Sequence, residues 1–156
     1  MSAMPQQGEK APEFVLPTDG GGNLSLAQLA GQKLVLYFYP KDDTSGCTRE
    51  AIDFNRLKPQ FAAAGAQIIG VSADNPASHE KFKAKYGLDF PLGSDEGKAV
   101  LTAYGVWTQK SMYGRKYMGI ERATFLIDAD GIIARIWPKV KVPGHAEEVL
   151  HAVQAL

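Results

Sequence analysis

The strongest structural signal in the chain lies in residues 34–48, Leu-Val-Leu-Tyr-Phe-Tyr-Pro-Lys-Asp-Asp-Thr-Ser-Gly-Cys-Thr. The first six of them, 34–39, are apolar on both faces, which predicts a central strand covered by helices on both sides. A second apolar run follows at 68–71, and apolar residues recur at helical spacing between the two runs, from Ala51 to Phe61. This order of strand, helix and strand predicts two parallel strands.

Weaker signals lie on the N-terminal side of this unit and within its helix. The expected elements are a polar arm (1–12), a short edge strand (13–17), a glycine turn (20–22) and one or two helical turns (25–30). Ser25 and Gln28 fit a capping box for these helical turns, and Gly31 fits the residue just past their end. Pro59 lies inside the helix between the two apolar runs, where a proline is expected to kink or split it.

Further elements follow on the C-terminal side. Two helices are expected first, one at 78–86 ended by Gly87 and one from Asp95 to about Tyr104. A long loop with at most a strand edge follows at 107–121. The chain then ends with a hairpin of strands 123–127 and 132–137 and a final helix whose buried side runs from Ala146 to Val153. Together the elements predict an α/β fold of three layers, a central mixed β-sheet flanked by helices. With 156 residues the chain is expected to form one domain, residues 1–156.

The composition narrows the classes of partner. Seventeen basic and seventeen acidic residues give a net charge of zero, so we expect neither nucleic acid nor an anionic membrane as a partner. No stretch reaches the roughly 20 apolar residues of a membrane span, and residues 1–10 lack the order of a signal peptide, which favours a cytoplasmic protein. The single cysteine excludes an internal disulfide. His79, His145 and His151 are too scattered to suggest a metal site, and His145 is expected at the surface or in a capping position.

Cys47 is the residue with the clearest chemical potential. The pattern above places it after the carboxyl end of a central strand and in the first turn of a helix, which is the usual place for a ligand site in an open α/β sheet. Free N–H groups and partial positive charge at a helix N-terminus favour the thiolate over the thiol, so the sulfur is expected to be nucleophilic near neutral pH. The alternative is a buried, inert thiol, but the junction of strand and helix argues against it.

Thr44 stands three residues before Cys47, a spacing that can aim its hydroxyl at the space in front of the sulfur. There it could form a hydrogen bond to a bound peroxide. The alternative is that Thr44 is only the N-cap of the helix. Both roles are compatible, because a hydroxyl has one donor and two acceptor sites.

The segment from Phe38 to Glu50 contains the pattern Pro40-x-x-x-Thr44-x-x-Cys47, which resembles the peroxidatic motif of the peroxiredoxins and, in its surroundings, their bacterioferritin-comigratory or PrxQ branch. Other stretches are similar to the family's opening (8–14), its second strand (69–72), its arginine-bearing strand (122–128) and the lead into its last helix (140–145). The similarity therefore runs from about residue 8 to the C-terminus.

The resemblance implies a thioredoxin-like fold and gives each residue of the motif a role. Cys47 would be the peroxidatic cysteine, Thr44 a hydrogen-bond donor to the peroxide, and Pro40 a shield over the sulfur. Arg122 would stabilise the thiolate and the departing oxygen. Negative charge develops on that oxygen as the O–O bond breaks, and water offers no fixed cation to stabilise it. The alternative for Arg122 is an ordinary surface arginine.

Two further residues are expected at the substrate site. Gly46 precedes the cysteine and would contribute through its place in the first helical turn. Glu50, one turn after the cysteine, would either brace Arg122 or favour the helix start through its negative charge.

The chain departs from many members of this branch, which carry a resolving cysteine five residues after the peroxidatic one or on the following helix. Ile52 occupies the first position, and the helix expected at 78–86 has Lys83 and no cysteine. Peroxide attack should leave Cys47 as a sulfenic acid, which needs another thiol to be recycled. The chain is therefore expected to be a one-cysteine enzyme that depends on an external thiol, either thioredoxin, glutaredoxin or a low-molecular-weight thiol.

The implied activity is the thiol-dependent reduction of hydrogen peroxide and organic hydroperoxides, an oxidoreductase reaction that needs no cofactor. The resemblance suggests that the protein is a monomer. A different hypothesis is a non-catalytic redox sensor, in which oxidised Cys47 forms a mixed disulfide with a partner. A third, a thioredoxin-like reductase, is contradicted by the lack of a Cys-x-x-Cys pair.

Overall fold

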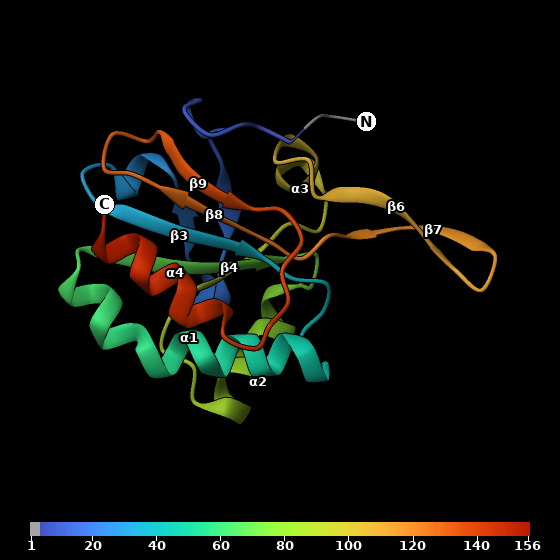
Figure 1. Ribbon diagram of the computed structural model, residues 1–156. Helices are drawn as coiled ribbons and strands as arrows, with labels where there is room; N and C mark the ends of the chain where they lie inside the picture. The colour runs from blue at the N-terminus through green and yellow to red at the C-terminus, as the bar shows by residue number, and fades with distance from the viewer. Residues whose placement is uncertain (1–3) are drawn as a thin grey trace.

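The computed structural model describes residues 4–156, and its centre is a five-stranded mixed sheet with the order β5-β4-β3-β8-β9 (Figure 1). The strands are β3 (Lys33–Phe38), β4 (Ala66–Ser72), β5 (Leu92–Ser94), β8 (Ala123–Ile127) and β9 (Ile133–Trp137). The central strand, β3, is parallel to β4 and antiparallel to β8. These pairings confirm the parallel pair predicted from the two apolar runs, and the pairing of β8 with β9 confirms the C-terminal hairpin.

Side chains of β3 alternate between two hydrophobic cores, one on each face of the sheet. The helices are α1 (Ser45–Ala63), α2 (Pro76–Tyr86), α3 (Ala99–Ala103) and α4 (His145–Gln154). Val35 and Tyr37 join the core formed with α1, α2 and α4, whereas Leu34 and Leu36 join the core formed with α3 and the N-terminal segments. Figure 1 shows α1, α2 and α4 on one side of the sheet and α3 on the other. The predicted thioredoxin-like, three-layer α/β fold is confirmed.

The N-terminal segments pack beside the main sheet. They comprise β1 (Val15–Pro17), β2 (Asn23–Ser25) and two 3₁₀ turns, η1 (Asp19–Gly21) and η2 (Ala27–Leu29). The predicted capping box is present: the Gln28 amide donates to Ser25 Oγ at 3.2 Å, and the Ser25 amide donates to Gln28 Oε1 at 3.3 Å. The preceding arm is held by Gly8, whose amide donates to the carbonyl of Ile133 at 2.8 Å, while residues 1–3 of the predicted arm lie outside the described residues. Within residues 4–156, no helix combines the length and apolar character needed to cross a membrane.

The helix α1 continues without a break through Pro59, so the predicted split is wrong. A proline inside a helix removes one backbone hydrogen bond and costs roughly 3 kcal/mol. Here Leu57 and Phe61, on either side of the proline, are buried in the same core and hold both halves of the helix in line. Pro59 itself lies on the exposed side of the helix.

The segment 107–121 was expected to be a loop, and this prediction is wrong. It forms an antiparallel hairpin of β6 (Trp107–Met112) and β7 (Arg115–Ile120) that extends away from the body of the protein (Figure 1). The turn residues Tyr113 and Gly114 have φ values of 51° and 77°, as a two-residue type I′ turn requires. Most side chains of the hairpin are exposed, so the sequence lacks the apolar alternation by which strands are recognised.

The third helix is shorter than predicted, because α3 begins only at Ala99. Lys98 precedes it with φ 64°, a left-handed conformation that no helix can include. Asp95 was expected inside the first turn. Instead, its carboxylate reaches the helix from the preceding loop and accepts the amide of Leu101 at 2.7 Å.

Candidate active site

Cys47 occupies the first turn of α1, directly after the loop that leaves the carboxyl end of β3. The residue is buried, with 2% of its surface exposed. Amides in the first turn of a helix have no carbonyl partner within the helix. Thr44, at the N-cap position, makes no side-chain hydrogen bond to them. The sulfur therefore lies at the positive end of α1, as the sequence predicted.

Arg122 reaches this sulfur because β8 runs antiparallel to β3. The register pairs Phe38 with Ala123, which brings Arg122 level with the chain that continues from β3 toward α1. Its Nη2 donates to Cys47 Sγ at 3.3 Å, and its Nη1 donates to Glu50 Oε1 at 2.7 Å. One guanidinium thus joins the sulfur to a carboxylate one helical turn away.

Burial and charge act against each other in this group. Desolvation raises the pKa of Glu50 to about 7, although Arg122 lowers it in part. Burial also pulls the pKa of Arg122 down, but the negative charges of Glu50 and Cys47 outweigh burial and raise it above its ordinary value. The second carboxylate oxygen, Glu50 Oε2, is buried and finds no hydrogen-bond partner among residues 4–156. Arg122 therefore stays charged between the sulfur and Glu50, whose carboxylate accepts one of its N–H groups.

Gly46 permits the close approach of the guanidinium. A Cβ at this position would lie 3.2 Å from Arg122 Nη2. Thr44 turns its side chain toward the loop, where Oγ1 donates to the carbonyl of Lys41 at 2.8 Å. Pro40 follows β3 on the exposed surface. The structure therefore brings Cys47 together with three of the predicted residues, whereas the hydroxyl of Thr44 is engaged elsewhere and Pro40 lies on the outside of the loop.

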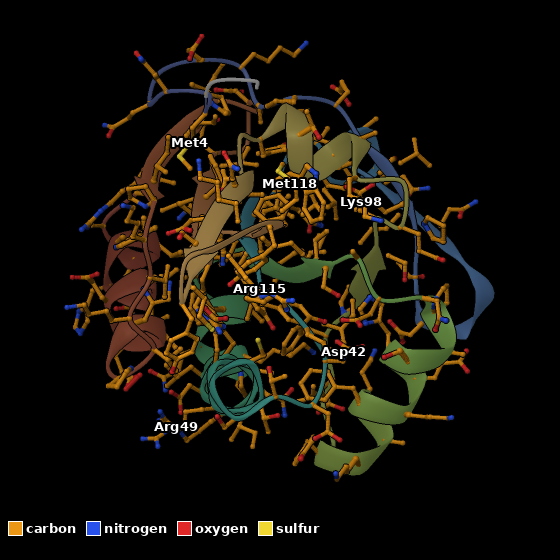
Figure 2. The ribbon with its side chains drawn as sticks, turned by 90° about the vertical axis from the view of Figure 1, so that its right-hand side faces the viewer. Met4, Asp42, Arg49, Lys98, Arg115 and Met118 are labelled. Atoms are coloured by element: carbon orange, nitrogen blue, oxygen red, sulfur yellow. The ribbon has the colours of Figure 1, made fainter. Side chains whose placement is uncertain are left out.

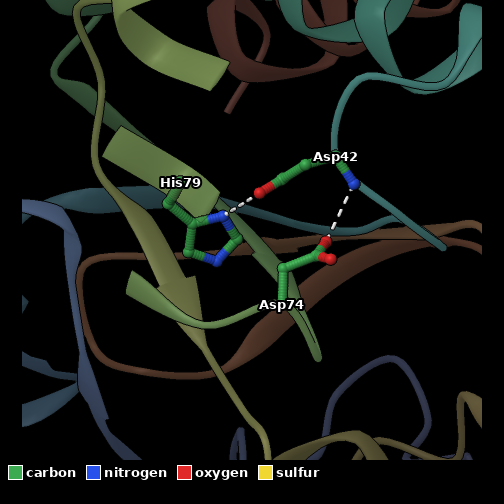
Figure 3. A group of neighbouring side chains, drawn as sticks. All are labelled: Asp42, Asp74 and His79. Atoms are coloured by element: carbon green, nitrogen blue, oxygen red, sulfur yellow. Dashed lines mark hydrogen bonds and ion pairs between the residues drawn. The ribbon is translucent and has the colours of Figure 1, made fainter. Parts of the chain in front are cut away.

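A second polar group adjoins the site, and sequence reasoning missed it. In Figure 2, Asp42 lies between α1 and α2, while Arg49 points outward from α1. Figure 3 shows the carboxylate of Asp42 facing His79 of α2, with His79 Nδ1 2.7 Å from Asp42 Oδ2. The amide of Asp42 donates to Asp74 Oδ2 at 2.8 Å. The sequence shows only an aspartate in the loop and a histidine on a helix, and nothing in it predicts that the two side chains are in contact.

These ligand-type atoms of Asp42, Asp74 and His79 lie within 4.8 Å of one another, close enough to hold a metal ion. Each of them is already engaged, however. Asp74 Oδ2 accepts the amide of Asp42 and the hydroxyl of Ser72, and His79 Nδ1 faces Asp42. Hydrogen bonds within the protein account for the group without an ion.

His145 was expected at the surface or in a capping position, and this prediction is wrong. The side chain is buried at the start of α4, where the His145 ring packs edge-on against Phe54 and Trp137. Its Nε2 lies 2.8 Å from the hydroxyl of Thr124. Burial lowers the pKa of His145 to about 4, so the ring is neutral near pH 7.

Known proteins are similar to this chain in sequence over most of its length. The family model described as AhpC/TSA family matches residues 7–136. A putative peroxiredoxin bcp of Coxiella burnetii is 53% identical over 92% of this chain and 95% of its own length. A peroxiredoxin Bcp of Xanthomonas campestris is 50% identical over 93% of this chain and 92% of its own length.

Solved structures are similar along most of the chain. The bacterioferritin comigratory protein of Xanthomonas campestris, studied for its alkyl peroxide reduction activity, has a TM-score of 0.88 and 49% identity over 91% of this chain and 90% of its own. A cysteine-to-serine mutant of Xylella fastidiosa PrxQ has a TM-score of 0.93 and 43% identity over 99% of this chain and 98% of its own. The Xanthomonas campestris peroxiredoxin Q has been solved as mutants of two different cysteines, whereas this chain has one cysteine, Cys47.

Proposed function

Because this chain belongs to the AhpC/TSA family and is a thiol-dependent peroxidase of the peroxiredoxin type, we propose that Cys47 is its peroxidatic nucleophile. The observation that carries the assignment is the hydrogen bond of 3.3 Å from Arg122 Nη2 to Cys47 Sγ. A cation and a helix N-terminus at the same sulfur stabilise a thiolate, which is the form that attacks. With one cysteine in the chain, the enzyme is of the one-cysteine type.

The reaction we propose begins with attack of the Cys47 thiolate on one peroxide oxygen. An S–O bond forms, the O–O bond breaks, and the other oxygen leaves as hydroxide or alkoxide and takes up a proton to give water or an alcohol. Sulfur is oxidised to the sulfenic acid and the peroxide is reduced. Arg122 is placed to meet the charge of the leaving oxygen, since its Nη2 already lies at the sulfur. Hydrogen peroxide and organic hydroperoxides are the proposed substrates.

We assign supporting roles to the neighbouring residues. Glu50 keeps the guanidinium oriented, and Gly46 leaves the space in which it lies. Thr44 would donate to the peroxide after its hydroxyl turns from the carbonyl of Lys41, while Pro40 would shield the sulfur. The redox-sensor alternative is not favoured, because the relatives are peroxiredoxins.

An external thiol would complete the cycle. It attacks the sulfenic sulfur to form a mixed disulfide with release of water, and a second thiol then frees Cys47 as one disulfide leaves. Thioredoxin, glutaredoxin and small thiols are the candidates. A lone cysteine without a disulfide suits a reducing compartment, which supports a cytoplasmic location. We also propose that the enzyme is a monomer, which sedimentation analysis of the purified chain would check.

The replacement Cys47→Ser tests the assignment, because it removes the nucleophile with little change in volume. Peroxide consumption should fall to the background rate with every reductant of a panel that contains thioredoxin, glutaredoxin and small thiols. After the native protein has reacted with one equivalent of peroxide, mass spectrometry should show one added oxygen at Cys47. Steady turnover by the variant would disprove the assignment, and a single stoichiometric oxidation of the native protein with every reductant would support the sensor instead.

A further inference from the structure

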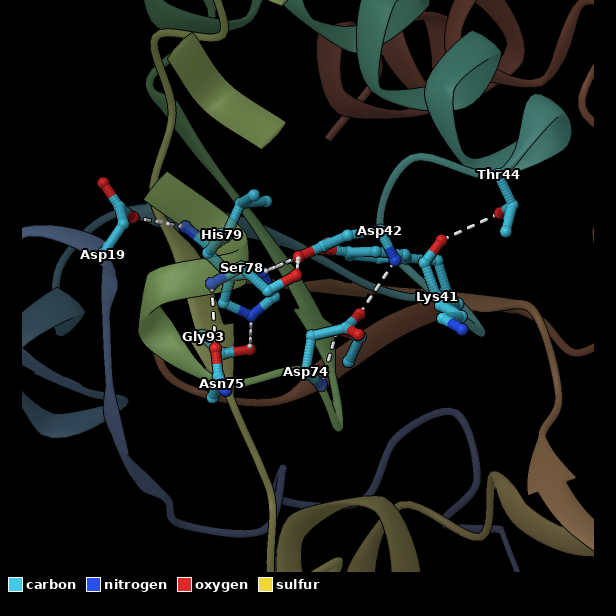
Figure 4. Close-up of polar contacts among 12 residues, drawn as sticks. Asp19, Lys41, Asp42, Thr44, Asp74, Asn75, Ser78, His79 and Gly93 are labelled. Atoms are coloured by element: carbon cyan, nitrogen blue, oxygen red, sulfur yellow. Dashed lines mark hydrogen bonds and ion pairs between the residues drawn. The ribbon is translucent and has the colours of Figure 1, made fainter. Parts of the chain in front are cut away.

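The loop that leads into the first turn of α1 is tied to α2 by a buried group of side chains. Asp42 of this loop accepts the hydroxyl of Tyr39 at 2.5 Å. It also accepts the hydroxyl of Ser78 at 2.8 Å, and its Oδ2 lies 2.7 Å from His79 Nδ1 (Figure 4). The four residues Tyr39, Asp42, Ser78 and His79 are called the Asp42 clamp below. Asp42 and His79 are both buried, at 7% and 0% exposure.

The proton on His79 follows from its two neighbours. Nε2 lies 3.1 Å from the carbonyl oxygen of Gly93, which can only accept, so Nε2 carries a hydrogen. Nδ1 faces a carboxylate oxygen of Asp42 that already accepts the hydroxyl of Ser78. One further proton must therefore lie between Nδ1 and Asp42. The ring thus bridges β5 and the loop through two hydrogen bonds that no single amide group can reproduce.

The clamp has a weaker extension at the surface. Asp43 accepts hydrogen bonds from Lys85 Nζ at 2.9 Å and from the hydroxyl of Tyr86 at 2.5 Å, but its carboxylate is exposed. Exposed ion pairs contribute little, whereas breaking a buried one is costly. The hold on the loop therefore depends mainly on Asp42.

The position of this loop decides whether another thiol can reach the sulfur of Cys47. Cys47 has only 2% of its surface exposed, so the chain around it must move before the sulfur of another thiol can reach Sγ. A peroxide is small and reacts between Sγ and the guanidinium of Arg122, which requires the loop in place. The two half-reactions thus need opposite states of the same loop.

We propose that Asp42 and His79 are positioning residues that set the balance between these two states, an inference that rests on the function proposed above. The clamp holds the loop from Pro40 to Thr44 against α2, keeps Cys47 at Arg122 for the reaction with peroxide, and limits the opening that admits the reducing thiol. Loosening it slows the first half-reaction and speeds the second. A residue that only stabilised the fold would not separate the two.

The test compares His79→Gln with Lys83→Gln. The second variant removes a part-buried ion pair of the same helix, Lys83 Nζ to Asp19 Oδ2 at 2.7 Å, without touching the loop. Each half-reaction is followed in a single turnover, first with hydrogen peroxide and then by reducing the oxidised protein with thioredoxin. Amide hydrogen exchange of the peptide covering residues 40–48 is measured by mass spectrometry.

For His79→Gln we expect exchange in 40–48 to rise roughly tenfold or more, the factor for losing one buried hydrogen bond to a charged group. The peroxide step should slow by about the same factor and the thioredoxin step should become faster. Lys83→Gln should resemble the native protein in all three measurements. Equal slowing of both steps, or unchanged exchange in a folded His79→Gln protein, would overturn the proposal.

If His79→Gln does not fold, Ser78→Ala replaces it, since it removes one of the three hydrogen bonds to the Asp42 carboxylate. A smaller change of the same pattern supports the clamp, and no separation of the two steps refutes it. The exchange measurement needs no turnover. If the native protein failed to consume peroxide, the proposed function would fall, while exchange in 40–48 would still decide whether the clamp holds the loop.

Discussion

Gly46 shows how a single missing methyl group sets the geometry of the site. Alanine is the better helix former by up to about 1 kcal/mol, so the backbone of α1 should accept Gly46→Ala. Its Cβ would lie 3.2 Å from Arg122 Nη2, a tighter contact than usual, so the guanidinium beside Cys47 must shift by a few tenths of an ångström. We expect the rate of reaction with peroxide to fall at least about tenfold while stability to urea stays equal or rises. Stopped-flow kinetics and urea unfolding measure the two effects.

Gly97→Ala is the matched control for this change. Gly97 lies in an exposed loop, and a Cβ there would meet nothing within 4 Å. This variant should keep the native rate. An equal loss of rate in both variants, or a loss of stability in Gly46→Ala large enough to unfold it, would contradict the geometric explanation.

The residues of the site differ in how far the sequence could predict them. Cys47 stands at a strand end and a helix start, so its place follows from local pattern alone. Arg122 could be suggested only by the family resemblance, because its contact depends on the register of β8 against β3. The pairing of Asp42 with His79, 37 residues apart, depends on how α2 packs beside the loop, and no local pattern encodes that.

At the scale of elements, α1 tolerates a proline that the helix itself disfavours. Pro59 is exposed, so replacing it removes no core contact, and alanine restores the backbone donor to the carbonyl of Asn55. Pro59→Ala should therefore stabilise the protein by about 1–3 kcal/mol. Urea unfolding measures this gain, with the same dependence of the unfolding free energy on urea concentration used for both proteins.

Gln60→Ala is the control, since Gln60 is the exposed neighbour of the proline and already donates its own amide. It should change stability by at most about 0.5 kcal/mol. A destabilised Pro59→Ala protein would show that the ring of Pro59 contributes contacts that the helix needs. It would also mean that packing of Leu57 and Phe61 is not what keeps α1 unbroken.

The predictions of elements were most accurate where burial dictates the spacing of apolar residues along the sequence. β3, β4 and β8 carry apolar runs, β9 is apolar apart from Arg135, and all four were recognised. The hairpin of β6 and β7 was missed because its strands are mostly exposed and no core dictates their pattern. Its only signal was the dipeptide Tyr113-Gly114, in which a tyrosine takes a positive φ that asparagine or glycine usually provides.

At the scale of the whole molecule, the site and the core are not separate. Cys47 belongs to the same buried cluster as Tyr37 and Phe54, on the face of the sheet that carries α1 and α4. Glu50 and His145 are ionisable groups of this same layer, and both are buried. Stability of the protein should therefore depend on pH through groups close to the site.

The two groups act in opposite directions. Burial raises the pKa of Glu50 from 4.5 to about 7, so between these values the native state keeps a proton that the unfolded chain has lost. Stability from this group falls as pH rises through that window. Burial lowers the pKa of His145 from 6.5 to about 4, so the unfolded chain binds the extra proton between these values and stability rises with pH.

Comparing the native protein with Glu50→Gln isolates the first effect, because His145 is present in both. From pH 4.5 to pH 7 the native protein should lose stability relative to the variant, by an amount on the order of 3 kcal/mol, since the glutamine cannot release a proton. Urea unfolding at several pH values measures the difference. A native protein that gained stability relative to Glu50→Gln over this range would mean that Arg122 keeps the carboxylate charged and that its attraction outweighs burial.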